Sequence, residues 1–171
     1  MTITAYIQEV PTYIDVESMP LINAYAWRLE HQSSGIYFCA RYVQSSGVPI
    51  TIKLHRLIAG ATKIIDGIAY NSEELIDHKD QNTLNNTLTN LRPCSKSQNA
   101  MNSKIPVNNT SGYKGVSWKQ DKKKWKAYLT LDHTQIHLGY FDDIEDAVRA
   151  RIEGAKRVFG EFFASNVETY K

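Results

Sequence analysis

Short runs of alternating apolar and polar residues dominate the first part of the chain. They predict strands at residues 12–16, 36–43 and 48–54, separated by turns rich in Ser and Gly. Between the first two strands, apolar residues recur at helical spacing behind Pro20, and proline is tolerated at the first position of a helix. The pattern therefore predicts an N-terminal antiparallel β meander with one short helix.

The pattern becomes more polar towards the middle of the chain. Residues 59–73 are predicted to be a turn-rich connection, and a short strand follows at 74–78. A loop rich in Asn, Asp and Thr, which we predict to be too polar to pack, leads to a second short strand at 90–92. A proline then precedes a helix predicted for residues 96–101. Residues 74–101 are thus predicted to form a ββα unit.

Regular alternation returns in the last third of the chain. Three strands are predicted, at residues 113–118, 125–131 and 135–140. A helix follows, for which Asp142 or Asp143 is the expected N-cap, and its apolar stripe ends at a glycine. This region is predicted to be a three-stranded antiparallel sheet packed on one helix.

These elements together predict the α+β class. The expected organisation has four segments: a first domain at residues 1–101 with the ββα core at 74–101, a polar linker at 102–111, a second domain at 112–165 and a tail at 166–171.

Charge is unevenly distributed along the chain. The net charge is only +2, but residues 92–126 hold nine Lys or Arg against one acidic residue, Asp121. Aromatic residues, among them Trp118, are interleaved with these cations, which favours a nucleic acid partner over a merely solvated lysine-rich turn. Arg92 and Lys96 begin this basic stretch and are candidate phosphate contacts.

Other sequence features bear on location. No apolar run reaches the length of a membrane span, and residues 1–17 lack the basic and apolar regions of a secretory signal. Two cysteines, Cys39 and Cys94, do not make a disulfide framework and favour free thiols in a reducing compartment. We therefore expect a cytoplasmic protein without membrane association.

The polar residues of the ββα unit suit the hydrolysis of a phosphodiester. That reaction needs a nucleophilic water, a base, and positive charge at the phosphate, which a divalent cation can supply. Asp77 and Asn99 offer oxygen ligands of the kind that Mg²⁺ prefers, and the scattered histidines argue against zinc. His78 is the natural general base. Asn90 is expected to hydrogen-bond across the loop, and Arg92 to contact a phosphate with both arms of its guanidinium.

The order of these residues resembles that of HNH nucleases, in the branch of phage homing endonucleases. Asn99 stands where many members have a third histidine, so the resemblance is to an H-N-N variant and implies Mg²⁺ or Mn²⁺. It also implies that Asp77 and Asn99 ligate one metal ion, that His78 activates water and that Asn90 orients the loop. The shared residues are Asp77-His78-Lys79-Asp80, Asn82, Asn90-Leu91-Arg92-Pro93 and Ser97-Gln98-Asn99, with Leu54-His55-Arg56-Leu57-Ile58 upstream.

The last third of the chain is similar to the AP2/ERF DNA-binding domain. The likeness lies in Asn109–Val116, Trp125-Lys126-Ala127, His137–Phe141 and Glu145-Asp146-Ala147, and the two resemblances together cover about residues 50–165. It implies a sheet that faces DNA, and we add Trp118 as a candidate contact. The residues at that family's DNA-facing positions are Lys114, Ser117, Lys119, Lys126, Tyr128, Thr130, Gln135 and His137.

The combined expectation is a site-directed, metal-dependent DNA endonuclease of homing type. It would act on double-stranded DNA as a monomer without an obligate protein partner, in the host cytoplasm if it is encoded by a phage. The resemblance implies that one such site nicks one strand and leaves 5′-phosphate and 3′-hydroxyl ends. The alternative is a sequence-specific DNA-binding or regulatory protein with an inactive nuclease domain. An RNA-directed nuclease is disfavoured by the AP2-like sheet.

Overall fold

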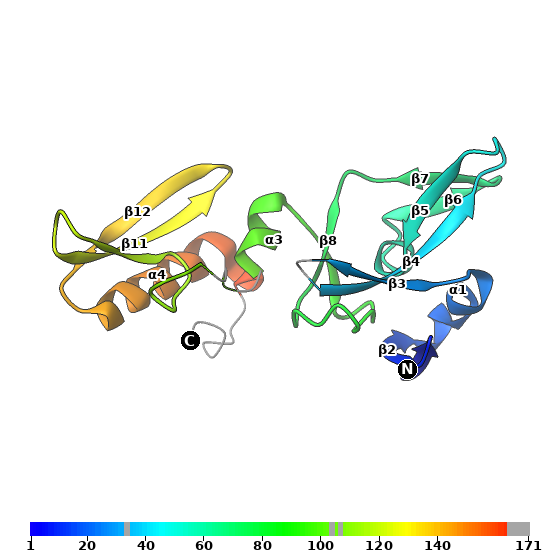
Figure 1. Cartoon of the computed structure of the whole chain (residues 1–171), viewed down its shortest axis with the longest axis horizontal. Coiled ribbons are helices and arrows are strands. Elements are labelled where there is room, and N and C mark those ends of the chain that lie inside the picture. The colour runs from blue at the N-terminus through cyan, green and yellow to red at the C-terminus, as the bar shows by residue number, and fades with distance from the viewer. Residues whose placement is uncertain (33–34, 103–104, 106–107, 164–171) are drawn as a thin grey trace. The chain divides into compact units, whose positions relative to one another are not determined.

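The chain folds into two compact units, residues 1–95 and residues 96–171 (Figure 1). The computed structural model describes residues 1–32, 35–102, 105 and 108–163, so the predicted tail lies outside the described residues, as does part of the predicted linker. The units divide just before the helix that was predicted to close the ββα unit. No helix of the described residues is long and apolar enough to cross a membrane.

A two-stranded hairpin begins the first unit. Strand β1 (Thr2–Ile7) pairs antiparallel with β2 (Val10–Asp15), and the short helices η1 (Val16–Ser18) and α1 (Met19–Ala24) follow. Strand β1 was not predicted. The hairpin turn consists of Gln8 and Glu9, both with positive φ, so the Asn-Gly or Asp-Gly signal typical of tight hairpins is absent from the sequence here.

The predicted meander is present as a three-stranded antiparallel sheet with strand order β3-β4-β5 (Figure 1). Its inner face carries Phe38, Ala40 and Ile52, which are almost fully buried in the core of the first unit. The residues directly after β5 form a helical turn, which places His55 against this core. The bounds are Arg28–Gln32 for β3, Gly35–Val43 for β4, Pro49–Lys53 for β5 and Leu54–Ile58 for α2.

Residues 59–73, predicted to be a turn-rich connection, contain two strands that were not predicted. Strands β6 (Thr62–Ile65) and β7 (Ile68–Asn71) form a hairpin there. The turn between them is Asp66-Gly67, and both residues have positive φ. Asp-Gly between apolar residues is a strong hairpin signal, so the sequence did hold the information. The two short strands of the predicted ββα unit follow as β8 (Leu75–His78) and β9 (Leu91–Cys94).

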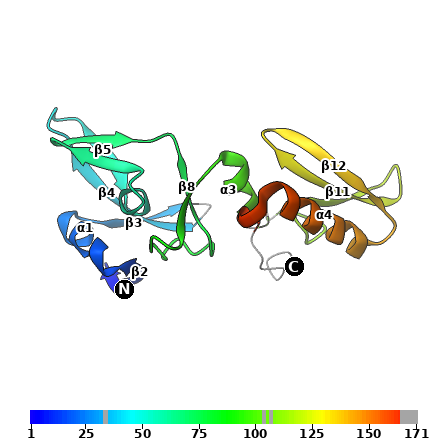
Figure 2. The same ribbon diagram turned by 180° about the vertical axis from the view of Figure 1, so that it is seen from behind.

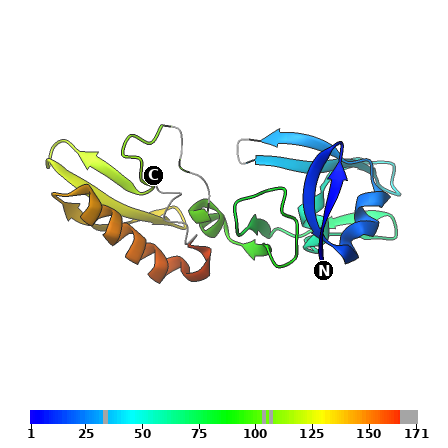
Figure 3. The same ribbon diagram turned by 90° about the horizontal axis from the view of Figure 1, so that it is seen from below.

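The second unit contains the predicted three-stranded antiparallel sheet, with strand order β10-β11-β12, packed on one long helix. Figure 2 and Figure 3 show the long helix, in orange to red, running along one face of the sheet. Asp143 caps this helix, because its Oδ1 accepts the backbone N–H of Glu145 at 2.6 Å. The bounds are Lys96–Asn102 for α3, Val116–Lys119 for β10, Lys124–Leu131 for β11, Thr134–Phe141 for β12, Ile144–Phe159 for α4 and Gly160–Phe162 for η2.

A glycine is required where the chain enters this sheet. Gly115 has φ +74, and a Cβ there would lie 2.5 Å from the carbonyl oxygen of Tyr128. The carbonyl of Gly115 in turn accepts the N–H of Tyr128 at 2.8 Å, beside the bulge between Ala127 and Tyr128. The likeness of this unit to AP2/ERF domains stays a prediction.

Candidate active site

The loop between β8 and β9, residues 79–90, is closed by Asn90. The backbone N–H of Lys79 donates to the carbonyl of Asn90 at 3.0 Å. The Asn90 side chain donates to Asp80 Oδ1 at 2.9 Å and to the carbonyl of Asn85 at 2.8 Å, and it accepts the N–H of Asp80 at 3.1 Å. One amide therefore makes three hydrogen bonds, to Asp80 and Asn85, and the orienting role of Asn90 stays a prediction.

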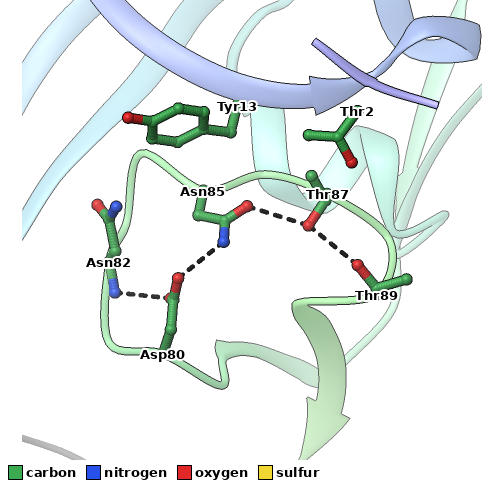
Figure 4. Close-up of a pocket in the computed structure, with 7 residues that line it drawn as sticks. All are labelled: Thr2, Tyr13, Asp80, Asn82, Asn85, Thr87 and Thr89. Carbon is green, nitrogen blue, oxygen red and sulfur yellow. Dashed lines mark hydrogen bonds between the residues drawn. The ribbon is translucent and has the colours of Figure 1, made fainter. Parts of the chain in front are cut away.

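An open polar pocket of about 450 Å³ lies beside this loop (Figure 4). The Asn85 side chain donates to Asp80 Oδ2 at 2.7 Å and accepts the Thr87 hydroxyl at 3.0 Å. The Thr89 hydroxyl donates to Thr87 Oγ1 at 3.3 Å. These side chains bind one another, so the residues that line this side of the pocket also hold the loop in its conformation. The lining residues are Thr2, Tyr13, Asp80, Asn82, Asn85, Thr87 and Thr89.

The N-terminal hairpin holds the other side of the loop. Tyr13 bonds through its backbone, because its N–H donates to the carbonyl of Leu84 at 2.9 Å and its carbonyl accepts the N–H of Asn86 at 2.8 Å. Asp15 Oδ2 accepts the N–H of Leu88 at 2.7 Å. The prediction that this loop is too polar to pack is therefore wrong. Its polar groups are satisfied partly within the loop and partly by strand β2, for which no role in the site was predicted.

His78 is buried at the end of β8. Its Nε2 lies 3.2 Å from Oδ1 of Asn86, which is itself buried and which the sequence analysis left out of the site. Burial lowers the pKa of His78, against the opposing effects of the Asn86 hydrogen bond and the carboxylates of Asp80 and Asp77. A lowered pKa keeps the imidazole neutral, which is the form that can accept a proton from water.

A second buried histidine lies next to His78. The rings of His55 and His78 are 5.3 Å apart between centroids, and the ring of Tyr37 lies 5.3 Å from His55 and 6.2 Å from His78. Burial, followed by the charges of His78, Lys53 and Arg56, lowers the pKa of His55 to about 3. His55 lies in the segment upstream of the motif, and no role was predicted for it from the sequence.

Asp77 and Arg92 form a buried ion pair across β8 and β9. Both Nε and Nη2 of Arg92 donate to Oδ2 of Asp77, at 3.0 and 2.9 Å. These residues face each other in the strand register. Arg92 was predicted to contact a phosphate, and the structure places its guanidinium on the carboxylate of Asp77.

The carboxylate of Asp77 is the kind of ligand that suits a hard cation. Mg²⁺ prefers oxygen ligands, keeps several of its waters and needs few protein ligands. No group of three His, Cys, Asp or Glu gathers within the described ranges, so they form no cage of the kind that binds zinc. Asp77, His78 and Asn90 lie together in the first unit, whereas Asn99 is exposed on α3 in the second unit.

The predicted DNA-facing residues of the second unit gather mostly on one face of the sheet. Lys126 pairs with Ser117 on β10, and Tyr128 pairs with His137 on β12. The Lys126 ammonium donates to Gln135 and lies 5.2 Å from the centroid of the Tyr128 ring. Because side chains alternate along a strand, this face is opposite the one that α4 covers. Lys119 and Thr130 lie on the same outward face.

Three other predicted contacts lie elsewhere in the second unit. Trp118 pairs with Trp125 on the helix side of the sheet, with ring centroids 5.2 Å apart, and is 43% exposed. The ammonium of Lys114 donates to the carbonyls of Ala100 and Met101 at the end of α3, and burial lowers the pKa of Lys114 to about 8. Lys96 is exposed at the first position of α3.

Comparisons with known proteins agree with this site. Residues 69–101 match the family model described as HNH endonuclease. The chain is 43% identical over 70 residues to "Protein 3.8" of Escherichia phage T7, a match covering 41% of this chain and 58% of that protein. It is 29% identical over 159 residues to "Uncharacterized HNH endonuclease L560" of Acanthamoeba polyphaga mimivirus, covering 90% of this chain and 73% of that protein.

No solved structure matches the chain significantly. The family match begins within β7 and ends within α3, so it contains the loop that Asn90 closes, the Asp77–Arg92 pair and the buried His78. Residues 69–101 are therefore similar to HNH endonucleases, and they hold the candidate site described above.

Proposed function

We propose that the protein is a metal-dependent DNA endonuclease in which His78 takes the proton from the attacking water. The observation that carries this proposal is the burial of His78, which lowers the pKa of its imidazole, at a position beside Asp77 in the chain and inside the segment that matches the HNH model. A histidine with a lowered pKa remains a proton acceptor at neutral pH, as a general base must.

Asp77 supplies an oxygen donor to the metal ion in this proposal, and the ion is Mg²⁺ or Mn²⁺. The second predicted donor, Asn99, belongs to the other unit. When bound, the ion supplies positive charge at the scissile phosphate and stabilises the leaving oxygen. Asn90 keeps the loop closed around His78 through its bonds to Asp80 and Asn85. Without a bound ion, the guanidinium of Arg92 balances the charge of the Asp77 carboxylate.

Hydrolysis at this site leaves 5′-phosphate and 3′-hydroxyl ends. One HNH segment is matched in the chain, which supports cleavage of one strand per binding event and action as a monomer. The order of the motif residues supports the further proposal that the protein is a homing endonuclease.

The outward face of the sheet in the second unit is the proposed DNA-binding surface. Cations, hydroxyls, an amide and an imidazole share this face. Groups of these kinds contact phosphates and base edges in protein–DNA complexes. It comprises Ser117, Lys119, Lys126, Tyr128, Thr130, Gln135 and His137. Trp118 lies on the other face and is left out of the proposed surface, as is Lys114, whose ammonium is bound to α3.

A plasmid assay with Mg²⁺ or Mn²⁺ tests the proposal. The wild-type protein is expected to convert supercoiled plasmid to open circles, and His78→Ala to lose about 10²- to 10⁴-fold in rate. The matched control is His31→Ala, because His31 is exposed on β3 of the same unit. Equal cleavage by His78→Ala would refute the role of His78. Tight, specific DNA binding without cleavage by the wild type would favour the regulatory alternative.

A further inference from the structure

We propose that Thr12 and Asn86 are positioning residues that hold His78 in the tautomer with its proton on Nε2. They form a chain of hydrogen bonds from the N-terminal hairpin to the imidazole. The assignment of the tautomer stands on these contacts alone, and its catalytic consequence rests on the proposed function of His78.

The chain of bonds begins at the Thr12 hydroxyl. A hydroxyl has one hydrogen, and that of Thr12 is donated to the carbonyl of Leu84 at 2.8 Å. Thr12 Oγ1 therefore acts as an acceptor towards its next neighbour, the Asn86 side chain, at 2.9 Å. The group of Asn86 that faces Thr12 must accordingly be the NH₂.

The orientation of the Asn86 amide then decides the state of His78. With its NH₂ directed to Thr12 and, more weakly, to the carbonyl of Thr83 at 3.5 Å, the amide presents Oδ1 to His78 Nε2 at 3.2 Å. An amide oxygen can only accept, so Nε2 carries the hydrogen. In the neutral ring the lone pair is consequently on Nδ1, which becomes the nitrogen that accepts a proton.

Because the surrounding groups are buried, the Asn86 amide has one favourable orientation. Thr12 is 0%, Asn86 1% and His78 5% exposed, so water does not replace a missing partner. Turning the amide over would set its oxygen against the carbonyl of Thr83 and against Thr12 Oγ1, whose hydrogen is donated to the carbonyl of Leu84. Both of those contacts are repulsive.

The hairpin holds the loop by other bonds as well, which makes the proposal testable. The backbone bonds of Tyr13 and the carboxylate of Asp15 attach β2 to the loop without the Thr12 hydroxyl. Thr12→Val keeps the shape of the side chain and removes its acceptor, so it frees the amide to turn. Thr12→Ser keeps the hydroxyl.

Long-range ¹H–¹⁵N correlation spectra of the histidine rings, recorded on the full chain at about pH 8, report the tautomer directly. In the wild type, His78 is expected to show a protonated Nε2 and an unprotonated Nδ1. Thr12→Val should move the populations towards the other tautomer, and Thr12→Ser should restore the wild-type pattern. A protonated Nδ1 in the wild type would overturn the proposal, as would a Thr12→Val spectrum identical to that of the wild type.

The cleavage rate gives a second measurement. If His78 is the base, Thr12→Val should lower kcat about tenfold or more with little change in KM, because the ground-state contacts with DNA are untouched. Thr12→Ser should recover most of kcat, and Thr4→Val, on the exposed side of the same hairpin, serves as the matched control. An unchanged kcat for Thr12→Val would refute the positioning role. A wild type with the expected tautomer but no nuclease activity would refute the proposed function and leave the tautomer assignment standing.

Discussion

The loop at residues 79–90 and the outward face of the second unit's sheet are both polar, but they use their polar groups in opposite ways. In the loop, Asn86, Thr87 and Asn90 are buried, and their side chains bind other parts of the first unit. On the sheet, Thr130, Gln135 and His137 are exposed. The same kinds of side chain thus form a rigid framework in one region and a surface available to a ligand in the other.

The difference has a physical cause and a consequence. A buried polar group that loses its partner retains the full cost of its desolvation, whereas an exposed one exchanges its partner for water. Substitutions in the loop should therefore reduce stability, while substitutions on the sheet face should change DNA binding with little effect on stability. The same contrast between buried and exposed polar groups applies to the ion pairs and the histidines of the first unit.

The largest effect is expected for the buried ion pair. Arg92→Leu leaves the carboxylate of Asp77 buried without its cation, and should reduce the free energy of unfolding by about 3–5 kcal/mol. The exposed pair Arg28–Glu30 in the same unit is the matched control, and Arg28→Leu should cost roughly 0–1 kcal/mol. Urea denaturation measures both. Similar losses for the two variants would contradict the contrast.

The next effect concerns the amide that closes the loop. Asn90→Ala removes partners from Asp80 and Asn85, and should cost about 1–3 kcal/mol of unfolding free energy. Gln135→Ala, on the sheet face, should change the unfolding free energy of its unit by less than about 0.5 kcal/mol. Thermal and urea unfolding of the two variants distinguish these outcomes, and a destabilised Gln135→Ala would mean that the sheet face is also structural.

Acid should weaken the first unit through His55. Its folded-state pKa of about 3 lies below the ordinary value, so between about pH 6 and pH 4 the unfolded chain binds a proton that the folded chain does not. Stability therefore falls as the pH falls, by about 1.4 kcal/mol per pH unit for this group. The groups that face or charge His55 are His78, Tyr37, Lys53 and Arg56.

The variant His55→Gln should reduce the slope of the unfolding free energy against pH by about the contribution of one bound proton. Unfolding free energies measured at several pH values in this window provide the test. His31→Gln, which alters an exposed histidine of the same unit, should keep the wild-type slope. Parallel curves for His55→Gln and the wild type would show that His55 takes up a proton in the folded state.

The smallest effect on the protein itself is expected on the sheet face. Lys119→Gln with Lys126→Gln should leave unfolding unchanged and weaken DNA binding, and the salt dependence of log K should become shallower by about 0.9 for each lost phosphate contact. Lys63→Gln, exposed on β6 of the first unit, is the matched control. Binding measured by fluorescence anisotropy at several salt concentrations gives the slope. An unchanged affinity and slope in the double variant would refute the proposed surface.

Local signals in the sequence were sufficient for much of the second unit. Alternating strands and an N-cap expected at Asp142 or Asp143 predicted its sheet and helix, because side-chain period and capping act between residues close in the chain. The assignment of Asp77, His78 and Asn90 to the site came from their spacing in one short segment and stays a prediction. The hairpin at Asp66-Gly67 was missed although its turn residues were visible.

Contacts between distant residues had no such signal. Thr12 and Asn86 are 74 positions apart, and His55 reaches His78 from a helical turn that follows another sheet. No role was predicted for Asn86, because its neighbours in the sequence are also Asn and Thr and nothing local distinguishes it from them. The partner of Arg92 was likewise not predictable from the sequence. A guanidinium binds a carboxylate or a phosphate equally well, and the sequence does not say which lies nearby.

The sequence by itself determined the α+β class, the ββα segment and the identity of the groups that can perform hydrolysis. These follow from periodicity and from the spacing of residues within a few turns of chain. The tertiary structure alone decided which polar groups are buried and which partner each one has. Those facts depend on strand β2 packing against a loop far along the chain, and burial with a fixed partner lowers the pKa of His78 and orients its imidazole.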